Sequence, residues 1–327
     1  MPAAFYLNPL GFMPREVRSD TIASAVIWSL AEMGRDVEPL IKDGSLRVSS
    51  AMPMLKIQGN ERVLFFPKPK IPPPAKAGSA DIDKIKSYKQ VSYLQDKIFI
   101  DLLSGSLSVW DIVSRIDQNY EVRGQLIAEK GVLENFDLMP WTRVRNAVNR
   151  IKGGADNFFT SHGTFYMNAG LFFLLEGSDD WVSSTVLALR FLQDRGIGGE
   201  VSIGHGRFNF ETYEREIHHR IKEIILPSGA NSEGAPDEEG AVLLSLYLPK
   251  PEEWIKICSR KDRLYYSLCW RAGRRSSGPK KRVLFLEEGS VVPLVKVEGM
   301  HEVVATNPPS LEWGHPLIAR IRLGGDL

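Results

Sequence analysis

The sequence is poor in cysteine and lacks long apolar runs. Cys258 and Cys269 are the only cysteines among 327 residues, too few for a disulfide framework or a zinc cage, which indicates a reducing compartment. The start, MPAAFYLNPLGF, lacks the basic region and long apolar core of a signal peptide. The longest apolar runs, such as 169–175, are too short to cross a bilayer. We therefore expect a cytoplasmic protein without a membrane partner.

The sequence also lacks an excess of charge of one sign. The 41 Lys and Arg residues nearly balance the 40 Asp and Glu residues, which leaves a net charge of +1. This balance argues against an unspecialised polycation, although it conceals local clusters. With 43% hydrophobic residues, a chain of this length is expected to form two domains with a sizeable core.

Signatures of common catalytic and metal sites are missing. No Gly-Lys-Ser/Thr, Gly-x-Ser-x-Gly, His-Glu-x-x-His or Cys-x-x-Cys pattern occurs. His218 and His219 are adjacent, so on a helix their side chains diverge by about 100° and chelate poorly. We expect no metal site and no cofactor.

The first 212 residues alternate strand and helix patterns. A strand is predicted over 3–7, and Ser19-Asp20-Thr21 caps a helix predicted over 22–33. Further strands are predicted at 46–49, 62–66, 165–167, 169–175 and 208–210, and a second helix at 181–194. Apart from a long insertion, this order is βαββαβ, the ferredoxin-like arrangement of RNA-recognition folds. We therefore expect an α+β protein.

The insertion starts with proline and continues with lysine. Four prolines between positions 69 and 74 predict an extended, polyproline-like exit from the preceding strand. Residues 81–104 are lysine-rich with apolar residues at helical spacing, and 110–118 is a candidate short helix. We interpret this segment as a mobile or partner-contacting insertion rather than a domain.

The remainder of the chain is predicted to be mostly β. Residues 228–240 read as a polar, acidic linker. A helix is predicted at 251–257, and strands are predicted at 242–248, 265–270, 283–286, 291–297, 301–305 and 317–323. Between Lys256 and Arg282 there are ten Lys or Arg residues and one acid, Asp262. This cluster suits nucleic acid or an acidic partner protein, or is a solvated face.

A glycine-rich loop follows the second predicted helix. Residues 196–206 hold five glycines between Arg195 and Arg207, which suggests backbone contact with a negatively charged ligand, or a flexible surface turn. Because the loop lies after a helix and before a strand, it is not a dinucleotide-binding fingerprint. Only His162 and His205 are placed to act as a general base on a 2′-hydroxyl.

A second basic cluster precedes the predicted strand at 165–167. It consists of Arg143, Arg145, Arg150 and Lys152, interspersed with asparagine and glycine. One interpretation is a solvated basic face. The other is a surface that steers an RNA backbone, which makes binding depend on salt.

These features resemble a known family. The loop Gly-Ile-Gly-Gly-x-x-Ser-x-Gly-x-Gly-Arg-Phe, at 196–208, resembles that of the RAMP superfamily of CRISPR proteins. Four further segments resemble the fourth subunit of the Csm (type III-A) effector complex: RSDTIASA at 18–25, LFFPKP at 64–69, RNAVNR at 145–150 and LFLEEGSV at 284–291. The matches run in order over nearly the whole chain, and the ordered set specifies the subunit.

The resemblance implies two tandem ferredoxin-like (RRM-like) domains of the RAMP type. The first domain covers 1–212 and has an insertion at about 68–136 that contains a thumb. The second covers 241–327, and a connecting segment at 213–240 joins the two. It implies a non-catalytic subunit that grips the 5′ handle of the CRISPR RNA and caps the backbone filament. Its partners are that RNA, the adjacent backbone RAMP subunit, the large polymerase-like subunit, and target RNA near the guide 5′ end.

The resemblance also gives a set of expected RNA-binding residues: Arg18, Ser19, Asp20, Lys68, Arg143, Arg145, Arg150, Lys152, Gly196, Gly198, Gly199, Ser202, Gly204, His205, Gly206 and Arg207. Glu200 and Val201 depart from the family, in which a basic residue is common there. Three alternatives remain open: the equivalent subunit of the type III-B complex, a metal-independent CRISPR-RNA-processing endoribonuclease, and a protein-interaction module.

Overall fold

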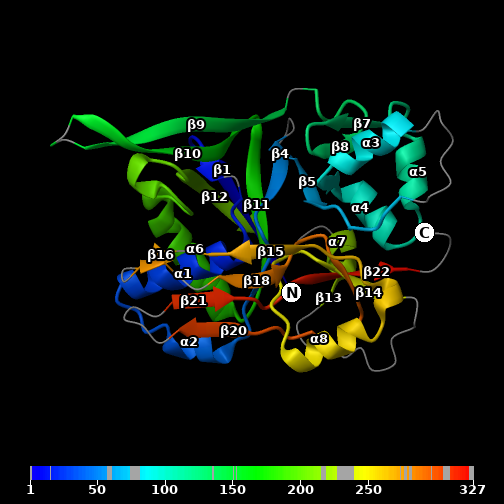
Figure 1. Ribbon diagram of the computed structural model, residues 1–327. Helices are drawn as coiled ribbons and strands as arrows, with labels where there is room; N and C mark the ends of the chain where they lie inside the picture. Colours follow the sequence, from blue (N-terminus) through cyan, green and yellow to red (C-terminus); the bar gives the residue numbers. More distant parts are fainter. Residues whose placement is uncertain are drawn as a thin grey trace.

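The computed structural model is an α+β protein with one large sheet and several small ones (Figure 1). No helix in the described part of the chain is long and apolar enough to span a membrane. The structure describes residues 2–14, 16–56, 61–73, 82–134, 136–149, 151, 153–214, 219–226, 239–272, 274–275, 278–279, 282–295, 297–304 and 310–323.

The large sheet is organised around β1 (Ala3–Pro9), which pairs with a strand on each side. Its order is β12-β1-β11-β4-β5-β6-β8-β7, with β3 also pairing with β11. All pairs are antiparallel except β6 with β8. The strands not yet bounded are β3 (Arg47–Val48), β4 (Met52–Lys56), β5 (Arg62–Pro67), β6 (Tyr93–Gln95), β7 (Tyr120–Arg123), β8 (Leu126–Glu129), β11 (Ala169–Glu176) and β12 (Phe208–Glu214).

Both faces of β1 are buried. Phe5 points into one core, where it stacks on Phe173 at 5.1 Å between ring centroids and lies beneath α1 (Ser19–Glu32) and α6 (Asp179–Arg195). Tyr6 points into the other core, which the insertion and the C-terminal strands complete. Because successive side chains alternate across a strand, an apolar run such as this one suits a sheet covered on both sides.

The insertion is packed, which corrects its interpretation as mobile. Its strand β6 extends the large sheet from β5, and Phe99 of α4 stacks on Phe66 of β5 at 4.8 Å. The helical spacing of its apolar residues therefore marks a buried face. Its helices are α3 (Ile82–Gln90), α4 (Asp96–Leu103) and α5 (Val109–Ser114).

A long hairpin, β9 (Asp137–Asn149) with β10 (Gly154–Met167), runs along one side of the molecule and projects at its tip (Figure 1). Only 165–167 of it was predicted as a strand. Its hydrophobic residues do not mark a buried face, because Val144 and Phe158 are exposed, at 69% and 74%. At its base, β10 also pairs with β2 (Met13–Pro14).

The C-terminal part forms a four-stranded sheet of order β13-β22-β14-β19, with α8 (Pro251–Cys258) packed on a core of its own. Residues 228–238 of the predicted linker lie outside the described residues. Its last two positions, 239 and 240, begin strand β14. The remaining elements are α2 (Glu38–Asp43), α7 (His219–Ile224), β13 (Ile225–Leu226), β14 (Glu239–Leu243), β15 (Leu268–Arg271), β16 (Arg274–Arg275), β17 (Gly278–Pro279), β18 (Val283–Leu286), β19 (Val291–Pro293), β20 (His301–Val304), β21 (Ser310–Trp313) and β22 (Ile318–Arg322), with 3-10 turns η2 (Val201–Ile203) and η3 (Lys261–Arg263).

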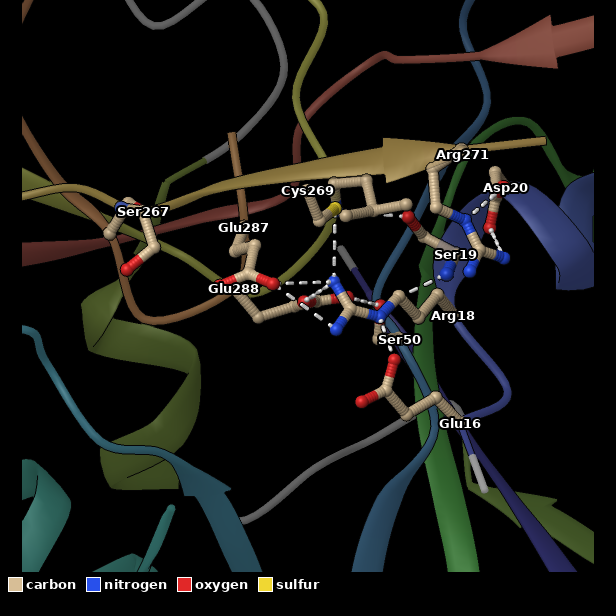
Figure 2. A network of polar contacts seen from close by, with 12 residues as sticks. Glu16, Arg18, Ser19, Asp20, Ser50, Ser267, Cys269, Arg271, Glu287 and Glu288 are labelled. Carbon is tan, nitrogen blue, oxygen red and sulfur yellow. Dashed lines mark hydrogen bonds and ion pairs between the residues drawn. The ribbon is translucent and has the colours of Figure 1, made fainter. Parts of the chain in front are cut away.

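The start of α1 is bonded to the C-terminal part through Arg18 (Figure 2). Its side chain is only 13% exposed and pairs with Glu16 at 2.7 Å, Glu287 at 3.3 Å and Glu288 at 3.2 Å. Burial raises the pKa of Glu288, while Arg18 opposes that rise. Cys269 accepts a further hydrogen bond from Arg18 at 3.2 Å.

Ser19 and Asp20 complete this joint (Figure 2). Ser19 is 2% exposed; its backbone N–H donates to Ser50 Oγ at 2.9 Å, and its Oγ accepts from the backbone N–H of Leu246 at 2.9 Å. Asp20 is 8% exposed and accepts two hydrogen bonds from Arg271, at 2.8 and 3.0 Å. Arg18, Ser19 and Asp20, all expected to contact RNA, thus have protein partners in this structure.

Replacing Asp20 by alanine leaves the guanidinium of Arg271, whose side chain is 23% exposed, without its carboxylate partner. We expect the free energy of unfolding to fall by about 2–3 kcal/mol, since a half-buried charge loses its bidentate partner. Urea denaturation measures the change. Glu38→Ala is the control, because its ion pair with Lys42 is exposed at 70% and 73% and solvent screens such pairs. Equal shifts in the two variants would contradict the assignment.

Candidate nucleic-acid interface

The base of the glycine-rich loop is closed by backbone hydrogen bonds. Ile197 N–H donates to Gly206 O at 2.9 Å, and Gly206 N–H donates to Phe12 O at 2.9 Å. Gly196 and Gly206 have φ of +90° and +74°, and a Cβ on Gly206 would collide with Ile197 O. These two glycines are therefore required by the close approach of the chain at the base of the loop.

The tip of the loop is exposed to solvent. Gly198, Gly199, Ser202 and Gly204 are all exposed there. At Gly198 the φ is +90° and a Cβ would lie 2.6 Å from Pro14 Cγ, whereas at Gly199 nothing lies within 4 Å. The backbone at Gly199 is thus open to a ligand, while Gly198 is also required for packing.

Glu200 fastens this tip to the hairpin. It accepts a hydrogen bond from Ser161 Oγ at 2.7 Å and pairs with Arg145 Nη1 at 3.4 Å. Its second carboxylate oxygen lies 3.3 Å from His205 Nδ1. The departure from a basic residue at this position therefore has a structural reason, because Glu200 joins the loop to both strands of the protein's β9–β10 hairpin.

His205 lies behind the loop rather than on its surface. Its side chain is 12% exposed, and its ring packs edge-on against Trp141 at 5.3 Å. Trp141 in turn stacks on Phe12 at 4.4 Å. Arg207, one residue past Gly206, is exposed and has no ion pair among the described residues, so it is free to meet a charged ligand.

The basic cluster lies on the hairpin. Arg143 and Arg145 share one face of β9, opposite Ser161 and Phe159 of β10. Arg145 lies over the Phe159 ring at 5.2 Å in addition to its contact with Glu200. Arg143 is exposed, without an ion pair to any described residue. Arg150 and Lys152 lie outside the described residues.

The opposite face of the hairpin exposes several apolar side chains among polar ones, which the sequence interpretation missed. Val144 and Val148 of β9 alternate with the arginines and are 69% and 60% exposed, and Phe158 of β10 is 74% exposed. The signal in the sequence is the spacing Arg-Val-Arg-x-x-Val at 143–148, in which cations and apolar residues alternate with the strand period. The hairpin thus offers cations on one face and apolar side chains on the other.

A cleft of about 780 Å³ lies between the base of the hairpin and the insertion. Trp141 borders it and also touches His205, so the cleft and the glycine-rich loop meet at this side chain. His162 lines it too, with Nδ1 3.1 Å from Thr142 Oγ1. The cations that line it are Arg18, Lys68, Lys70, Lys89 and Arg123, and the acids are Glu16, Asp137, Glu287 and Glu288.

Lys68 is the cleft lysine with the most perturbed environment. Its Nζ donates to Tyr88 O at 2.6 Å and lies 4.4 Å from the centre of the Tyr88 ring. Burial, reinforced by the nearby charge of Lys70, lowers the pKa of Lys68 to about 8. Lys70 itself pairs with Glu287 at 2.7 Å. With this pKa, Lys68 loses most of its charge between pH 7 and 9, whereas a lysine with an ordinary pKa remains charged there.

These groups suit the binding of a polyanion. Open glycine amides and unpaired arginines bind phosphates, and exposed aromatic rings stack bases. Among the described residues, no group of three His, Cys, Asp or Glu side chains is placed to hold a metal ion.

No family model matches the chain. A relative from Thermococcus onnurineus (strain NA1), named CRISPR system Cms protein Csm4, is 27% identical over 300 residues, which are 88% of this chain and 86% of the relative.

Solved structures share the fold. The Csm4-containing structure of a Csm3-Csm4 subcomplex of the type III-A interference complex superposes with a TM-score of 0.67 at 18% identity, over 98% of this chain and 99% of that chain. A chain of the Csm1-Csm4 cassette in complex with pppApA has a TM-score of 0.59 at 18% identity, over 99% of each chain. The likeness covers both the large sheet and the C-terminal part.

Replacing Glu200 by asparagine tests how the loop is held. Asparagine tolerates the φ of +60° at this position but is too short to reach Ser161, Arg145 and His205 together. We expect the amides of 198–204 to exchange with deuterium about tenfold faster, because opening the tip no longer breaks these contacts. Hydrogen-exchange mass spectrometry measures the rates.

The control is Glu32→Asn. It removes an exposed ion pair, at 3.7 Å, with Arg195, the last residue of α6 before the glycine-rich loop. Its exchange at 198–204 should match the unmodified protein. Unchanged exchange in the Glu200 variant would show that the tip is held by its backbone alone.

Proposed function

We propose that this chain, which is similar to Csm4 over most of its length, is a RAMP-type, non-catalytic RNA-binding subunit of a type III-A (Csm) CRISPR effector complex. It grips the 5′ handle of the CRISPR RNA, caps the backbone filament and joins that filament to the large polymerase-like subunit, in the cytoplasm. Arg143 and Arg207, both exposed and without ion pairs to described residues, flank open glycine backbone; this observation carries the proposal.

The RNA lies on the hairpin and on the tip of the glycine-rich loop. Amides at Gly199 and Gly204 bond phosphates or splayed bases, and the two arginines add charge. Arg145 and His205 act indirectly, since Glu200 and Trp141 hold them. The fourteen expected residues that the structure describes thus divide into a surface group and a supporting group.

We propose that the chain comprises two tandem ferredoxin-like domains, 1–212 and 241–327, connected by 213–240. The order β12-β1-β11-β4, with α1 and α6 on one face, supports this for the first. The order β22-β14-β19 with α8 supports it for the second, which also receives β13 from the connecting segment.

The resemblance places a thumb, which wedges into the guide–target duplex, in the insertion. We propose instead that the hairpin is this thumb. The insertion is packed into the sheet, whereas the hairpin projects and exposes Phe158 at 74%. Apolar side chains that insert between base steps need such exposure. Target RNA near the guide 5′ end is then the ligand of the apolar face.

Partners are proposed from the complexes of the neighbours. Csm4 is seen with Csm3 in one structure and with Csm1 in another. We propose that this chain binds an adjacent backbone subunit and a large subunit of the same kinds. The equivalent role in a type III-B complex remains the alternative.

An endoribonuclease is the less favoured function. His205 is 12% exposed, and its Nδ1 faces Glu200. His162 is exposed in the cleft but is bonded to Thr142 rather than to an acid or a base. His205 thus has a carboxylate partner but little exposure, and His162 is exposed but has no carboxylate partner, so neither combines the access and the pairing that general acid–base cleavage of RNA uses.

The handle and the loop are tested together. We expect CRISPR RNA with its native handle to bind at least about tenfold more tightly than RNA with a scrambled handle at physiological salt. Gly199→Asp should remove that preference, because it adds a negative charge at the open backbone without the strain that a change at Gly198 causes. Fluorescence anisotropy measures both affinities.

Ser106→Asp, an exposed position in the insertion, adds the same charge away from the loop and should leave both affinities unchanged. Equal affinity of the unmodified protein for the two RNAs would refute handle recognition. Full preference in a folded Gly199→Asp variant would refute the role of the loop.

The low pKa of Lys68 predicts a pH effect. With a pKa of about 8, the ammonium is mostly present at pH 7 and mostly lost at pH 9, so its attraction to phosphate falls as pH rises. We expect RNA affinity to drop about fivefold across this range. Titrations of labelled RNA at fixed ionic strength measure it.

Lys68→Arg keeps its charge and should give a flat profile between pH 7 and 9. Lys86→Arg, an exposed lysine paired with Asp83 at 3.3 Å, should retain the drop. A drop of the same size in the Lys68→Arg variant would assign the pH effect to another group.

A further inference from the structure

The outer face of β15 is apolar, which inverts the usual alternation. Leu268 and Trp270 point to solvent with exposures of 48% and 64%, while Cys269 and Arg271 point inward to Arg18 and Asp20. A strand at the surface ordinarily buries its apolar residues and exposes its polar ones. This arrangement indicates that a further surface covers the outer face.

Further exposed apolar residues lie near Leu268 and Trp270. Leu284 of β18, 37% exposed, lies opposite Trp270. Tyr266, 43% exposed, precedes β15 on the same face and packs edge-on against Trp254 of α8 at 5.9 Å. The next residue of α8, Ile255, is 70% exposed. We call Ile255, Tyr266, Leu268, Trp270 and Leu284 the β15 patch.

The surroundings of the β15 patch are basic. Exposed cations there include Lys256 on α8, Lys261 in η3 and Arg282 before β18. The sequence from Lys256 to Arg282 carries ten Lys or Arg residues against one acid. A second copy of this chain would bring like charges together, so the complementary surface has an apolar centre and an acidic rim.

The chemistry favours protein over RNA as the occupant. Three of the five side chains are aliphatic, and Trp with aliphatic neighbours inside a charged rim is typical of a protein interface. Stacking of bases uses aromatic rings with cations among them. The arginine next to Trp270, Arg271, faces inward and pairs with Asp20, so its guanidinium is not offered to a base.

The position of the β15 patch selects among protein partners. In Figure 1, α8 lies at the opposite side of the molecule from the β9–β10 hairpin. If RNA lies on the hairpin, as proposed above, the backbone subunit that shares this RNA lies on the hairpin side. We infer that the β15 patch docks the large subunit of the complex, through an apolar surface rimmed by carboxylates; this rests on the proposed function.

Binding of the full chain to the Csm1-type large subunit from the same source, measured by biolayer interferometry, tests the inference. Trp270→Ala should weaken binding by about 30-fold, mainly through faster dissociation, since a central tryptophan is truncated. Lys256→Glu should slow association about threefold and reduce its salt dependence, because a rim charge steers encounter. Neither variant should change the affinity for CRISPR RNA.

Trp28→Ala is the matched control. Trp28 is 41% exposed on α1, beneath Arg195 at 5.0 Å, and its loss should leave large-subunit binding unchanged. Thermal unfolding of all three variants checks that they fold, and Trp270 at 64% exposure contributes little to the core.

Unchanged binding of the Trp270 variant to the large subunit would overturn the inference. A loss of RNA affinity in the Trp270 variant would also overturn it. So would a loss of binding to a Csm3-type backbone subunit while binding to the large subunit is unchanged. If the unmodified chain shows no handle preference yet Trp270→Ala still abolishes large-subunit binding, the proposed RNA function fails and the docking surface stands.

Discussion

The hydrogen-bonded joint at the start of α1 is the contact on which the two halves of this protein depend. Arg18 and Asp20 reach across to Glu287, Glu288 and Arg271, and Ser19 bonds two further backbone segments (Figure 2). Buried charges are tolerated only when each has its partner, so the joint fixes one relative placement of α1 and β15. The same pairing turns Cys269 and Arg271 inward and leaves the apolar side chains of β15 outside.

A second, smaller constraint positions the candidate RNA surface. Glu200 is one carboxylate with three partners, and it ties the tip of the glycine-rich loop to both strands of the hairpin. Arg145 and His205 are thereby withdrawn from the surface, and Arg143 and Arg207 are left exposed. A surface of few free cations beside open backbone suits recognition of a shaped single strand better than tight, unspecific binding to any polyanion.

Local signals predicted much of the fold. The helices α1 and α6, the strand β1 and the position of the glycine-rich loop follow from apolar spacing and from polar residues at the helix starts, which act within a few positions of the chain. The predicted cap is wrong in one respect, because Ser19 lies inside α1 and the N-cap position, Arg18, makes no side-chain capping hydrogen bond. The hairpin was largely missed, because Val144 and Phe158 are exposed and give no buried face to detect. The insertion was misread as mobile for a different reason. Its apolar residues at helical spacing were visible in the sequence, but its many lysines favoured an exposed segment, whereas Tyr88 and Phe99 are buried.

The sequence by itself determined the class of fold, the order of its main elements and the likeness to a Csm4 subunit, because these rest on periodicity and on ordered motifs. Only the tertiary structure decided which motif residues face solvent. Ser19 and Gly206 belong to motifs as clear as that of Gly199, yet the first two are buried in packing contacts, whereas Gly199 is open to solvent. Partners far apart in the chain, such as Asp20 with Arg271, set that difference, and no local pattern encodes them.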